Sequence, residues 1–544
     1  MDDLLRAIED ERERCGVPGA GVAVVRAGET VLEHGFGPGI TAATHFPIGS
    51  VTKAFTATAA GSLVDEGLLA WDVPVREYLP GFRMWDRAAT EQLTMRDLLC
   101  HRSGLPRHDQ VWYGNREATR ADVMRGLRHL RPSRPIRQEW QYSNLMYLAA
   151  GEVVAHLHGG TWEDAVRARV LRPLGMSGTF LTSDEALASG RLSGGLLDGG
   201  PMPRRDQDLC GASGSIISSA ADMAAWLRAN LDGGVVSDAT LRELHRPAML
   251  VPPPPIPWDE LRPMGYALGW HVDIYRGRRV VQHGGNVYGY SAVVSLMPEE
   301  GIGVVVLTNG DFNPLRDIVA FRVYDELLGL DPLPWGDRYR EMYAAATEGR
   351  GLAVARRREL SAGAPPGHPW EEYAGEYAHP AYGSLHVTAG PDGLAVALRD
   401  LPLATRHVNR EAFELHLDTL DQTFPARWNA DFEGNVRSVS VLFEPNVEPI
   451  EFVRVAQEAA PDTLASLTGS YRMGPARVLV ELVDGALRVS VVNRPSAVLK
   501  PRRGLVFDVE GQAGMWAEFL LDADGAGGEL VVWPLGRFTK EATA

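Results

Sequence analysis

The stretch FPIGSVTK (residues 46–53) joins an extended run to a helix rich in Ala and Thr, which we predict over residues 51–66. It places Ser50 and Lys53 three residues apart, and positions three apart on a helix lie on one face. Both side chains are therefore expected to point into the same space. A serine hydroxyl is a weak nucleophile until a neighbouring group takes its proton, and a desolvated lysine amine can do so. Free backbone N–H groups at the helix N-terminus can stabilise the oxyanion that follows.

The use of lysine in this chain favours a chemical role for Lys53. Of 54 Lys and Arg residues only three are lysines, Lys53, Lys500 and Lys540. Arginine cannot lose its proton in a protein, so a lysine at position 53 indicates a task that needs a group able to deprotonate. The alternative is a surface serine beside a solvated lysine, because Ser-x-x-Lys alone is a weak motif.

Length and composition limit the classes of protein. A chain of 544 residues is expected to form more than one domain, and 45% hydrophobic and 23% charged residues are ordinary for a globular protein. The net charge of −16 disfavours nucleic acids and anionic membrane surfaces as partners. Cys15, Cys100 and Cys210 are too far apart for a disulfide framework or a metal site, so we interpret them as core thiols in a reducing compartment.

The N-terminus and the histidines add two further expectations. Residues 1–12 are charged and amphipathic and lack the apolar core of a signal peptide, and no segment approaches 18 uninterrupted apolar residues. We therefore expect a cytoplasmic protein without a membrane partner. The His101/His108 and His156/His158 pairs have no carboxylate at ligand spacing, so neither a metal nor another cofactor is expected.

Apolar periodicity, caps and turn residues predict the elements of the first 360 residues. A hairpin is expected from residues 20–25 and 30–34. Beside the helix at 51–66, further helices are expected at residues 2–14, 93–100, 121–130, 145–157, 161–171, 220–231, 313–329 and 337–360. An antiparallel meander is expected from residues 266–272, 279–283, 291–297 and 303–309. Residues 185–212 and the proline-rich residues 251–257 are expected to be irregular.

The last third of the chain carries an internal repeat. After a linker at residues 362–369, short alternating runs indicate β-structure. YAGEY (373–377) recurs as LTGSY (467–471), GLAV (393–396) as GALRV (485–489), and DFEG (431–434) as DADG (522–525). Two copies of one small β-barrel explain this repeat most simply.

Two further motifs could complete the chemistry of a Ser/Lys pair. Tyr142-x-Asn144, at the entrance of a predicted helix, offers a phenolic hydroxyl and an amide. His283-Gly284-Gly285, at the end of a predicted edge strand, offers an imidazole and room for a substrate backbone. Each motif alone has a structural explanation, as a packing aromatic, a structural histidine or a turn.

Taken together and in this order, the three motifs resemble the penicillin-recognising serine hydrolases. The similarity is to the branch with class C β-lactamases, D,D-peptidases, D-aminopeptidases and esterases, whose general signature is Ser-x-x-Lys, Ser/Tyr-x-Asn and Lys-Thr-Gly. It runs from about residue 2 to 330 and includes the stretches VPG (17–19), LLCHRSGL (98–105), PLGM (173–176) and GW (269–270). The resemblance implies an α/β (α+β) β-lactamase/transpeptidase-like catalytic domain, with an antiparallel sheet flanked by helices beside an all-helical region.

The resemblance also implies roles for individual residues. Ser50 would be the nucleophile and Lys53 the base or proton shuttle. Tyr142 would act on the protons of the nucleophile and the leaving group, and Asn144 would bind Lys53 and the substrate amide. His283 would take the place of the Lys in Lys-Thr-Gly, with Gly284 and Gly285 beside the substrate. The backbone N–H groups of Ser50 and Asn286 would form the oxyanion hole.

The chain departs from the family pattern at two places. His283 removes a permanent cation that β-lactamases of the family use near the substrate carboxylate, which argues against β-lactamase activity. The stretch PIRQE (135–139) also lacks the usual Pro-Gly turn before Tyr142.

The repeated β module resembles the lipocalin-like domains appended to some members of the family. This gives four expected segments: a β-lactamase-like catalytic domain (1–335), a helical linker (336–369) and two lipocalin-like β-barrels (370–456 and 460–544). D-aminopeptidases of this type carry two such barrels, one of which limits the site to small substrates, whereas related peptide-cyclising thioesterases carry one.

These resemblances imply a serine hydrolase that forms an acyl-enzyme at Ser50 with small amides or esters, above all D-amino-acid amides or short peptides. A transacylase or peptide-cyclising thioesterase of the same fold is the main alternative. A true β-lactamase and an inactive binding protein are less favoured. The expected partner is a small molecule or short peptide, and a homodimer stays open.

Overall fold

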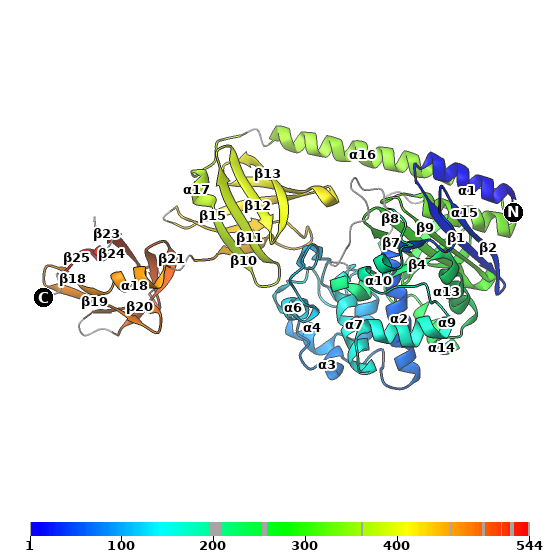
Figure 1. Cartoon of the computed structure of the whole chain (residues 1–544), viewed down its shortest axis with the longest axis horizontal. Helices are drawn as coiled ribbons and strands as arrows, with labels where there is room; N and C mark the ends of the chain where they lie inside the picture. Colours follow the sequence, from blue (N-terminus) through cyan, green and yellow to red (C-terminus); the bar gives the residue numbers. More distant parts are fainter. Residues whose placement is uncertain are drawn as a thin grey trace. The chain divides into compact units, whose positions relative to one another are not determined.

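The computed structural model of the chain describes residues 2–194, 208–252, 258–360, 363–432, 434–456, 459–491, 495–512, 514–522 and 527–541 (Figure 1). Most of the two segments predicted to be irregular, at 195–207 and 253–257, lies outside these residues, as do residues 523–525 of the repeat. The chain forms two compact units, Met1–Ala374 with Ala378–Phe452, and Gly375–Tyr377 with Val453–Ala544.

An antiparallel sheet of seven strands, in the order β2-β1-β9-β8-β7-β6-β5, forms the centre of the catalytic part. Its strands are β1 (Ala20–Arg26), β2 (Glu29–Phe36), β5 (Leu261–Tyr266), β6 (His271–Tyr275), β7 (Arg278–Val287), β8 (Tyr290–Met297) and β9 (Ile302–Thr308). The N-terminal hairpin joins the later meander where β1 pairs with β9, with Ala20 opposite Thr308. The predicted hairpin is confirmed, as are the meander strands predicted at residues 279–283, 291–297 and 303–309.

Helices cover both faces of this sheet, which explains the unbroken apolar run of β9. All seven residues of β9 are buried. Val304 and Val306 belong to a core that includes Leu4 of α1 and Phe321 of α15, and α13 contacts β9 as well. A strand covered on both faces has no polar side, so the alternation typical of a half-exposed strand disappears.

Among the described residues of this part, the nine predicted helices are present, and the structure adds six short helices that the sequence did not predict. The helices are α1 (Asp2–Arg14), α2 (Thr52–Asp65), α3 (Val75–Tyr78), α4 (Arg87–Gln92), α5 (Met95–Leu99), α6 (Arg120–Gly126), α7 (Asn144–His158), α8 (Trp162–Val166), α9 (Arg172–Leu174), α10 (Ser183–Ala188), α12 (Gly211–Gly214), α13 (Ala220–Asp232), α14 (Asp238–Leu244), α15 (Leu315–Leu328) and α16 (Trp335–Leu360). The six that were not predicted are α3, α4, α9, α10, α12 and α14. Residues 52–61 of α2 are all buried, because small side chains let other elements pack against every side of the helix.

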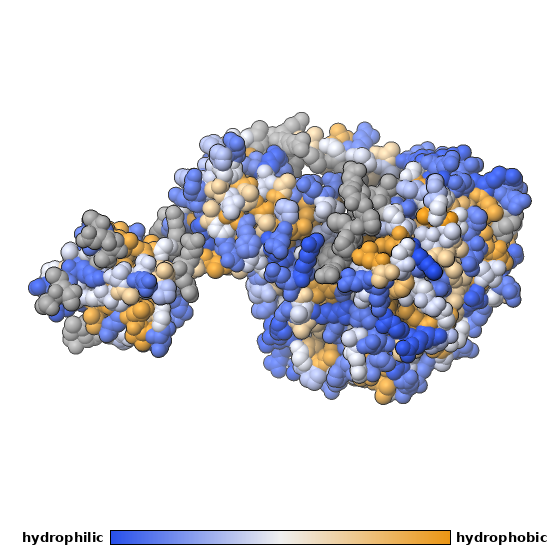
Figure 2. Space-filling view, viewed as in Figure 1, coloured by the Kyte–Doolittle hydropathy of each residue, from blue (hydrophilic) through white to orange (hydrophobic). Residues whose placement is uncertain are grey.

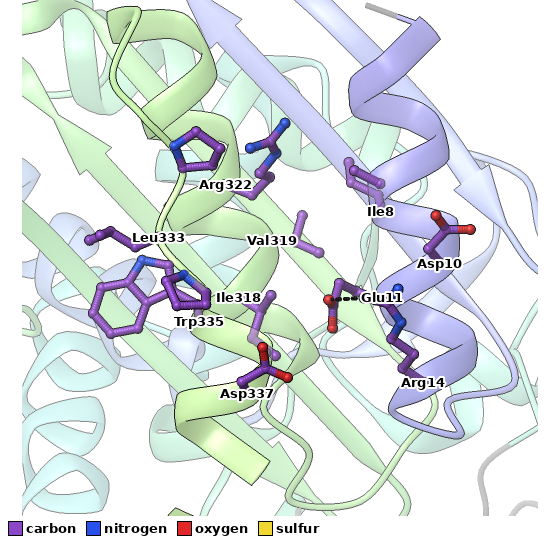
Figure 3. A pocket seen from close by; sticks show the side chains of 14 residues that line it. Ile8, Asp10, Glu11, Arg14, Ile318, Val319, Arg322, Leu333, Trp335 and Asp337 are labelled. Carbon is purple, nitrogen blue, oxygen red and sulfur yellow. Dashed lines mark hydrogen bonds and ion pairs between the residues drawn. The ribbon is translucent and has the colours of Figure 1, made fainter. Parts of the chain in front are cut away.

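Trp335, at the start of α16, packs on the sheet side of α15. Its ring lies 4.8 Å from that of Phe321, and its indole N–H donates to the Tyr275 hydroxyl at 3.1 Å. A small hollow of about 230 Å³ lies between α1, α15 and this segment, and Ile8, Val319 and Asp337 are among the residues that line it (Figure 3). These contacts hold the beginning of the long helix against the catalytic part.

One predicted strand is wrong. Residues 266–272 do not form a single strand, because β5 ends at Tyr266, β6 begins at His271, and a turn separates them. Gly269 in that turn has φ +87, and a Cβ there would lie 3.0 Å from the Lys53 carbonyl oxygen. The turn thus packs on α2 at a glycine that permits both the backbone conformation and the close approach.

The repeated region forms two closed antiparallel barrels of eight strands each. The first contains β10 (Gly375–His379), β11 (Gly383–Gly390), β12 (Gly393–Leu398), β13 (Leu401–Asn409), β14 (Ala412–Leu417), β15 (Gln422–Ala430), β16 (Val436–Val441) and β17 (Ile450–Arg454). The second contains β18 (Gly469–Met473), β19 (Ala476–Val483), β20 (Ala486–Val491), β21 (Ala497–Arg503), β22 (Val506–Val509), β23 (Trp516–Leu521), β24 (Gly527–Trp533) and β25 (Gly536–Lys540).

The repeat is structural as well as sequential. Each barrel opens with a short helix, α17 (Trp370–Tyr373) or α18 (Pro461–Ser466), followed by a strand that begins at a glycine of positive φ. Those glycines are Gly375 (φ +150) and Gly469 (φ +141), which occupy equivalent places in the two sequence copies. The predicted doubled β-barrel is therefore confirmed.

Hydrophilic residues cover much of the face viewed in Figure 2, with apolar residues in separate patches between them. Among the described residues, no helix combines the length and the apolar character needed to cross a membrane.

Candidate active site

Ser50 lies in a 3-10 turn, Gly49–Val51, that runs directly into α2. The turn follows β3 (His45–Pro47), which pairs with β4 (Ile217–Ser219). Gly49 has φ +53, and a Cβ there would lie 2.9 Å from the backbone nitrogen of Asn286. The turn carrying Ser50 thus lies against the backbone of β7, and a glycine is needed at its start.

The two glycines after His283 accommodate the protein itself. A Cβ on Gly285 would lie 1.8 Å from the Ile48 carbonyl oxygen, and a Cβ on Gly284 would meet the guanidinium of Arg316 at 3.2 Å. The space predicted to receive a substrate backbone is filled by the Ser50 turn and by Arg316. The predicted edge position of this strand is also wrong, because β7 lies between β6 and β8.

Lys53 is fully buried and forms a direct hydrogen bond with Ser50. Its Nζ donates to Ser50 Oγ at 3.0 Å, to Asn144 Oδ1 at 2.8 Å and to the Ser213 carbonyl at 2.8 Å. The predicted juxtaposition of Ser50 and Lys53 is present. Ser213, on α12, is a partner that the sequence did not indicate.

The environment of Lys53 favours the neutral amine. Burial and the positive charge of Arg107, opposed by Cys210 and Asp109, lower its pKa to about 7. Near neutral pH a large share of Lys53 is therefore unprotonated and can accept a proton from Ser50.

Tyr142 lies beside the same pair. Burial raises its pKa to about 12, although the Arg107 charge and a hydrogen bond with the Ser50 side chain oppose this rise. Tyr142 is thus a neutral phenol at ordinary pH and can pass a proton on. Its ring is 4.8 Å from Lys53 Nζ and 5.0 Å from the Arg107 guanidinium.

A chain of polar contacts continues from Lys53 to a charged pair. Asn144, the first residue of α7, accepts from Lys53 and donates its Nδ2 to Asp109 Oδ1 at 2.9 Å. Asp109 Oδ2 accepts from Arg107 Nε at 2.7 Å. The sequence analysis did not select Arg107 or Asp109, because contacts with distant parts of the chain, such as that between Asp109 and Asn144, bring them to the site.

His283 lies near Tyr142, with 6.4 Å between the centres of the two rings, and is 2% exposed. Its Nε2 is 2.8 Å from the Tyr266 hydroxyl and its Nδ1 is 2.7 Å from the Gly284 carbonyl, so we assign the proton to Nδ1. Burial, together with the charges of His271, Lys53 and Arg316, holds the His283 pKa well below its usual value. The imidazole is therefore neutral, and its predicted catalytic role stays a prediction.

His283 belongs to a group of buried and partly buried rings in mutual contact. Its members are His101, Trp140, Tyr142, Tyr147, Tyr266, His271 and His283. His101 Nδ1 accepts from the Ser143 backbone N–H at 3.1 Å, which fixes the segment between Tyr142 and Asn144. These contacts position Tyr142 in a chain that lacks the Pro-Gly turn before it.

Asn286 is held by its side chain while its backbone faces the Ser50 turn. Its Oδ1 accepts from Ser291 Oγ at 3.0 Å and from Arg316 Nη1 at 2.9 Å, and Arg316 also donates to the Gly285 carbonyl at 2.7 Å. A Cβ on Gly285 would be 3.1 Å from the Ser50 nitrogen, so the two segments adjoin closely. The oxyanion hole assigned to the N–H groups of Ser50 and Asn286 remains a prediction.

Ser50 opens into a cavity of about 860 Å³. Its walls from the catalytic part include Arg107, Asn144, Asn286 and Phe312, and the last of these is 62% exposed. The remaining walls come from the first barrel, at residues 420–425 and 442–446.

The first barrel also forms hydrogen bonds with the segment that carries Arg107 and Asp109. The Tyr382 hydroxyl is 2.6 Å from His108 Nδ1, and Arg399 donates to the Gln110 and Tyr113 carbonyls at 3.1 and 2.6 Å. His108 has φ +47, a conformation that a non-glycine residue adopts only where neighbours hold it.

No group of three or more His, Cys, Asp and Glu side chains among the described residues is arranged to hold a metal ion. The polar atoms around Ser50 are those of a nucleophile, an amine, a phenol and an amide. Together they can carry out proton transfer and acyl transfer.

Comparisons with known proteins agree with this arrangement. The beta-lactamase family matches residues 4–328, and a domain of unknown function, DUF3471, matches residues 359–454, where the first barrel lies. The unguisins hydrolase ungD' of Aspergillus campestris is 29% identical over 493 residues, which cover 82% of this chain and 90% of that protein. Penicillin-binding protein 4 of Amycolatopsis lactamdurans is 30% identical over 358 residues, 62% of this chain and 91% of that protein.

A solved structure shares the fold. The D-amino acid amidase of Ochrobactrum anthropi SV3 superposes with a TM-score of 0.52 at 22% identity, covering 60% of this chain and 99% of its own. Because the family match spans residues 4–328, more than half of the 544 residues, and the fold agrees with it, the chain belongs to the beta-lactamase family of serine hydrolases.

Proposed function

We propose that the chain hydrolyses small amides or esters through an acyl-enzyme at Ser50, with D-amino-acid amides and short peptides as its substrates. The observation that carries the proposal is the hydrogen bond of 3.0 Å between Ser50 Oγ and the buried amine of Lys53, whose pKa is lowered to about 7. A serine becomes a competent nucleophile beside such an amine, because the amine can take its proton.

Acylation begins when Ser50 Oγ attacks the substrate carbonyl carbon and its proton passes to Lys53 Nζ. The carbonyl oxygen becomes an oxyanion, for which the backbone N–H groups of Ser50 and Asn286 are the proposed donors. When the tetrahedral intermediate collapses, the leaving amine or alcohol needs a proton. Tyr142, a neutral phenol hydrogen-bonded to the Ser50 side chain, donates this proton and recovers one from Lys53.

Deacylation repeats these steps with water as the nucleophile. Water attacks the ester carbonyl, its proton passes through Tyr142 and Lys53, and Ser50 leaves as its hydroxyl. An amine in place of water would form a new amide, which makes a transacylase or peptide cyclase the alternative. Product analysis with and without an amine acceptor distinguishes the two outcomes.

The substrate class rests on two lines of support. The fold is shared with a D-amino acid amidase, and the hydrolase of Aspergillus campestris aligns with most of the chain, including barrel sequence. The neutral His283 argues against β-lactams, because the cation that family β-lactamases use near the substrate carboxylate is absent from position 283.

Intact-mass analysis with three acyl donors tests the proposal: a D-alanine anilide, a short-chain aryl ester and a cephalosporin. We expect the mass of the acyl group to be added to the wild type and not to Ser50→Ala, with turnover of the first two donors. Turnover that survives in Ser50→Ala would overturn the mechanism. Fast hydrolysis of the cephalosporin would overturn the argument from His283.

A further inference from the structure

Arg107 brings a permanent cation to the Ser50 cavity from a part of the chain outside the three motifs. It lines the same cavity as Ser50, and 54% of its side chain is exposed. Its guanidinium lies 5.0 Å from the centre of the Tyr142 ring, next to the proposed proton donor. The attraction of Asp109 raises the Arg107 pKa, so the side chain keeps its positive charge at ordinary pH.

The terminal amino groups of Arg107 are available to a ligand. Among the residues that the structure describes, its hydrogen bond is the one from Nε to Asp109 Oδ2. Asp109 itself is engaged on its other oxygen, Oδ1, which accepts from Asn144. A guanidinium held at Nε presents its two Nη groups as a fork, and a carboxylate fits that fork with two parallel hydrogen bonds.

The acidic residues of the cavity are less suited to bind the substrate. Glu444 is 4% exposed, and its two oxygens accept from the His108 and Asn446 backbone N–H groups at 3.1 and 3.3 Å. Asp421 is 92% exposed, at the turn between β14 and β15, where water screens its charge. Among the described residues, the charged group that lies beside the reacting atoms and can still bind a ligand is therefore the guanidinium of Arg107.

We propose that Arg107 anchors a carboxylate of the substrate next to the scissile bond, so that among the amides, esters and short peptides of the proposed function the enzyme prefers acidic ones, such as N-acylated peptides with a free carboxylate. The inference rests on the proposed function, because it assigns the substrate class of the Ser50 site. It supplies, from a different loop, the cation that His283 does not provide. A preference for ammonium-bearing compounds, such as free D-amino-acid amides, over acidic ones is the opposite prediction.

Two matched pairs of compounds test the charge and locate it. N-succinyl-D-alanine 4-nitroanilide against its N-butyryl isostere places the carboxylate on the acyl side. N-acetyl-D-alanyl-D-alanine against its C-terminal amide places it on the leaving group, and D-alanine 4-nitroanilide carries a free ammonium instead. The readout is kcat/KM or, for compounds hydrolysed slowly, the Ki for protection of Ser50 against a fluorophosphonate.

We expect the anionic member of one pair to be preferred by about 10- to 100-fold, as for a charged bidentate contact. The preference should vanish in Arg107→Gln and reverse in Arg107→Glu. Arg125→Gln is the matched control, since Arg125 lies on α6, pairs with Asp122 and should keep the preference. Because Arg107 also influences Lys53, only ratios between paired compounds in the same variant at the same pH are compared.

Several results would overturn the proposal. These are equal rates within both pairs, a preference that persists in Arg107→Gln, or a preference for the ammonium compound. Each of them, when turnover and labelling are lost in Ser50→Ala, leaves the serine hydrolase mechanism intact. Turnover or labelling that persists in Ser50→Ala would instead overturn the proposed function.

Discussion

Lys53 is the residue that should determine how the rate of the enzyme varies with pH. Its neutral form accepts the Ser50 proton, and burial lowers its pKa to about 7. We expect kcat/KM to rise with pH through about 7 and then to level off, because the neutral fraction grows as pH rises above the pKa. A pH–rate profile of an uncharged ester measures this limb. A rate that is flat from pH 5 to 9 would contradict the role of Lys53 as the base.

Variants of Arg107 and Asp109 should shift the rising limb of the pH–rate profile in opposite directions. Arg107 lowers the pKa of Lys53 and Asp109 raises it. The limb should therefore move to higher pH in Arg107→Gln and to lower pH in Asp109→Asn, in profiles measured on the same ester. A purely structural role for the pair would lower the rate in both variants without moving the limb in opposite directions.

Asn144 lies between Lys53 and Asp109, and a negative charge placed at position 144 tests how the site controls the charge of Lys53. In Asn144→Asp a carboxylate would replace the amide oxygen that accepts from Lys53 at 2.8 Å, which would hold the lysine protonated. We expect a loss of about 100-fold in kcat/KM at pH 7 that is partly recovered at higher pH. Asn144→Leu is the control and should lose activity without such recovery. Equal losses at all pH values in both variants would argue against this electrostatic account.

At the scale of elements, the decisive contact is that of β7 with the Ser50 turn. A Cβ at Gly285 would lie 1.8 Å from the Ile48 carbonyl, so Gly285→Ala must displace the turn from the strand. Misplacing a nucleophile by about 1 Å costs on the order of 100-fold in rate, and we expect at least that loss in kcat/KM.

Gly81→Ala provides the matched control for Gly285→Ala, because a Cβ at Gly81 would have no neighbour within 4 Å. This variant should keep wild-type activity. Circular dichroism and thermal unfolding of both variants show whether the fold survives. A folded Gly285→Ala protein with full activity would show that the turn and β7 can separate without loss of function.

The elements also show what the sequence could predict and why. The Ser50–Lys53 pair follows from local helix geometry, and the β9 run and the barrel repeat are visible as patterns. The single strand predicted at 266–272 fails because the conformation of Gly269 depends on α2, which is distant in sequence. Arg107 and Asp109 were not selected for the same reason, since a loop with a left-handed His108 takes its course from its neighbours.

At the scale of the whole chain, the first barrel acts on the site through the segment 107–113. Arg399, on the barrel, donates to the carbonyls of Gln110 and Tyr113 at 3.1 and 2.6 Å. These bonds fix the loop from which Asp109 reaches Asn144, and through it Lys53. The barrel is thereby part of the support of the catalytic groups, besides forming walls of the cavity.

Arg399→Met tests this support. It removes both bonds and should lower kcat/KM by about 10-fold or more, because the catalytic groups lose their fixed geometry. The pH limb should move as well, since Arg107 and Asp109 shift relative to Lys53. Arg406→Met is the matched control, because Arg406 lies on β13 and pairs with Glu414 within the barrel. If both variants kept wild-type rates and limbs, the barrel would be a wall of the cavity without influence on the chemistry at Ser50.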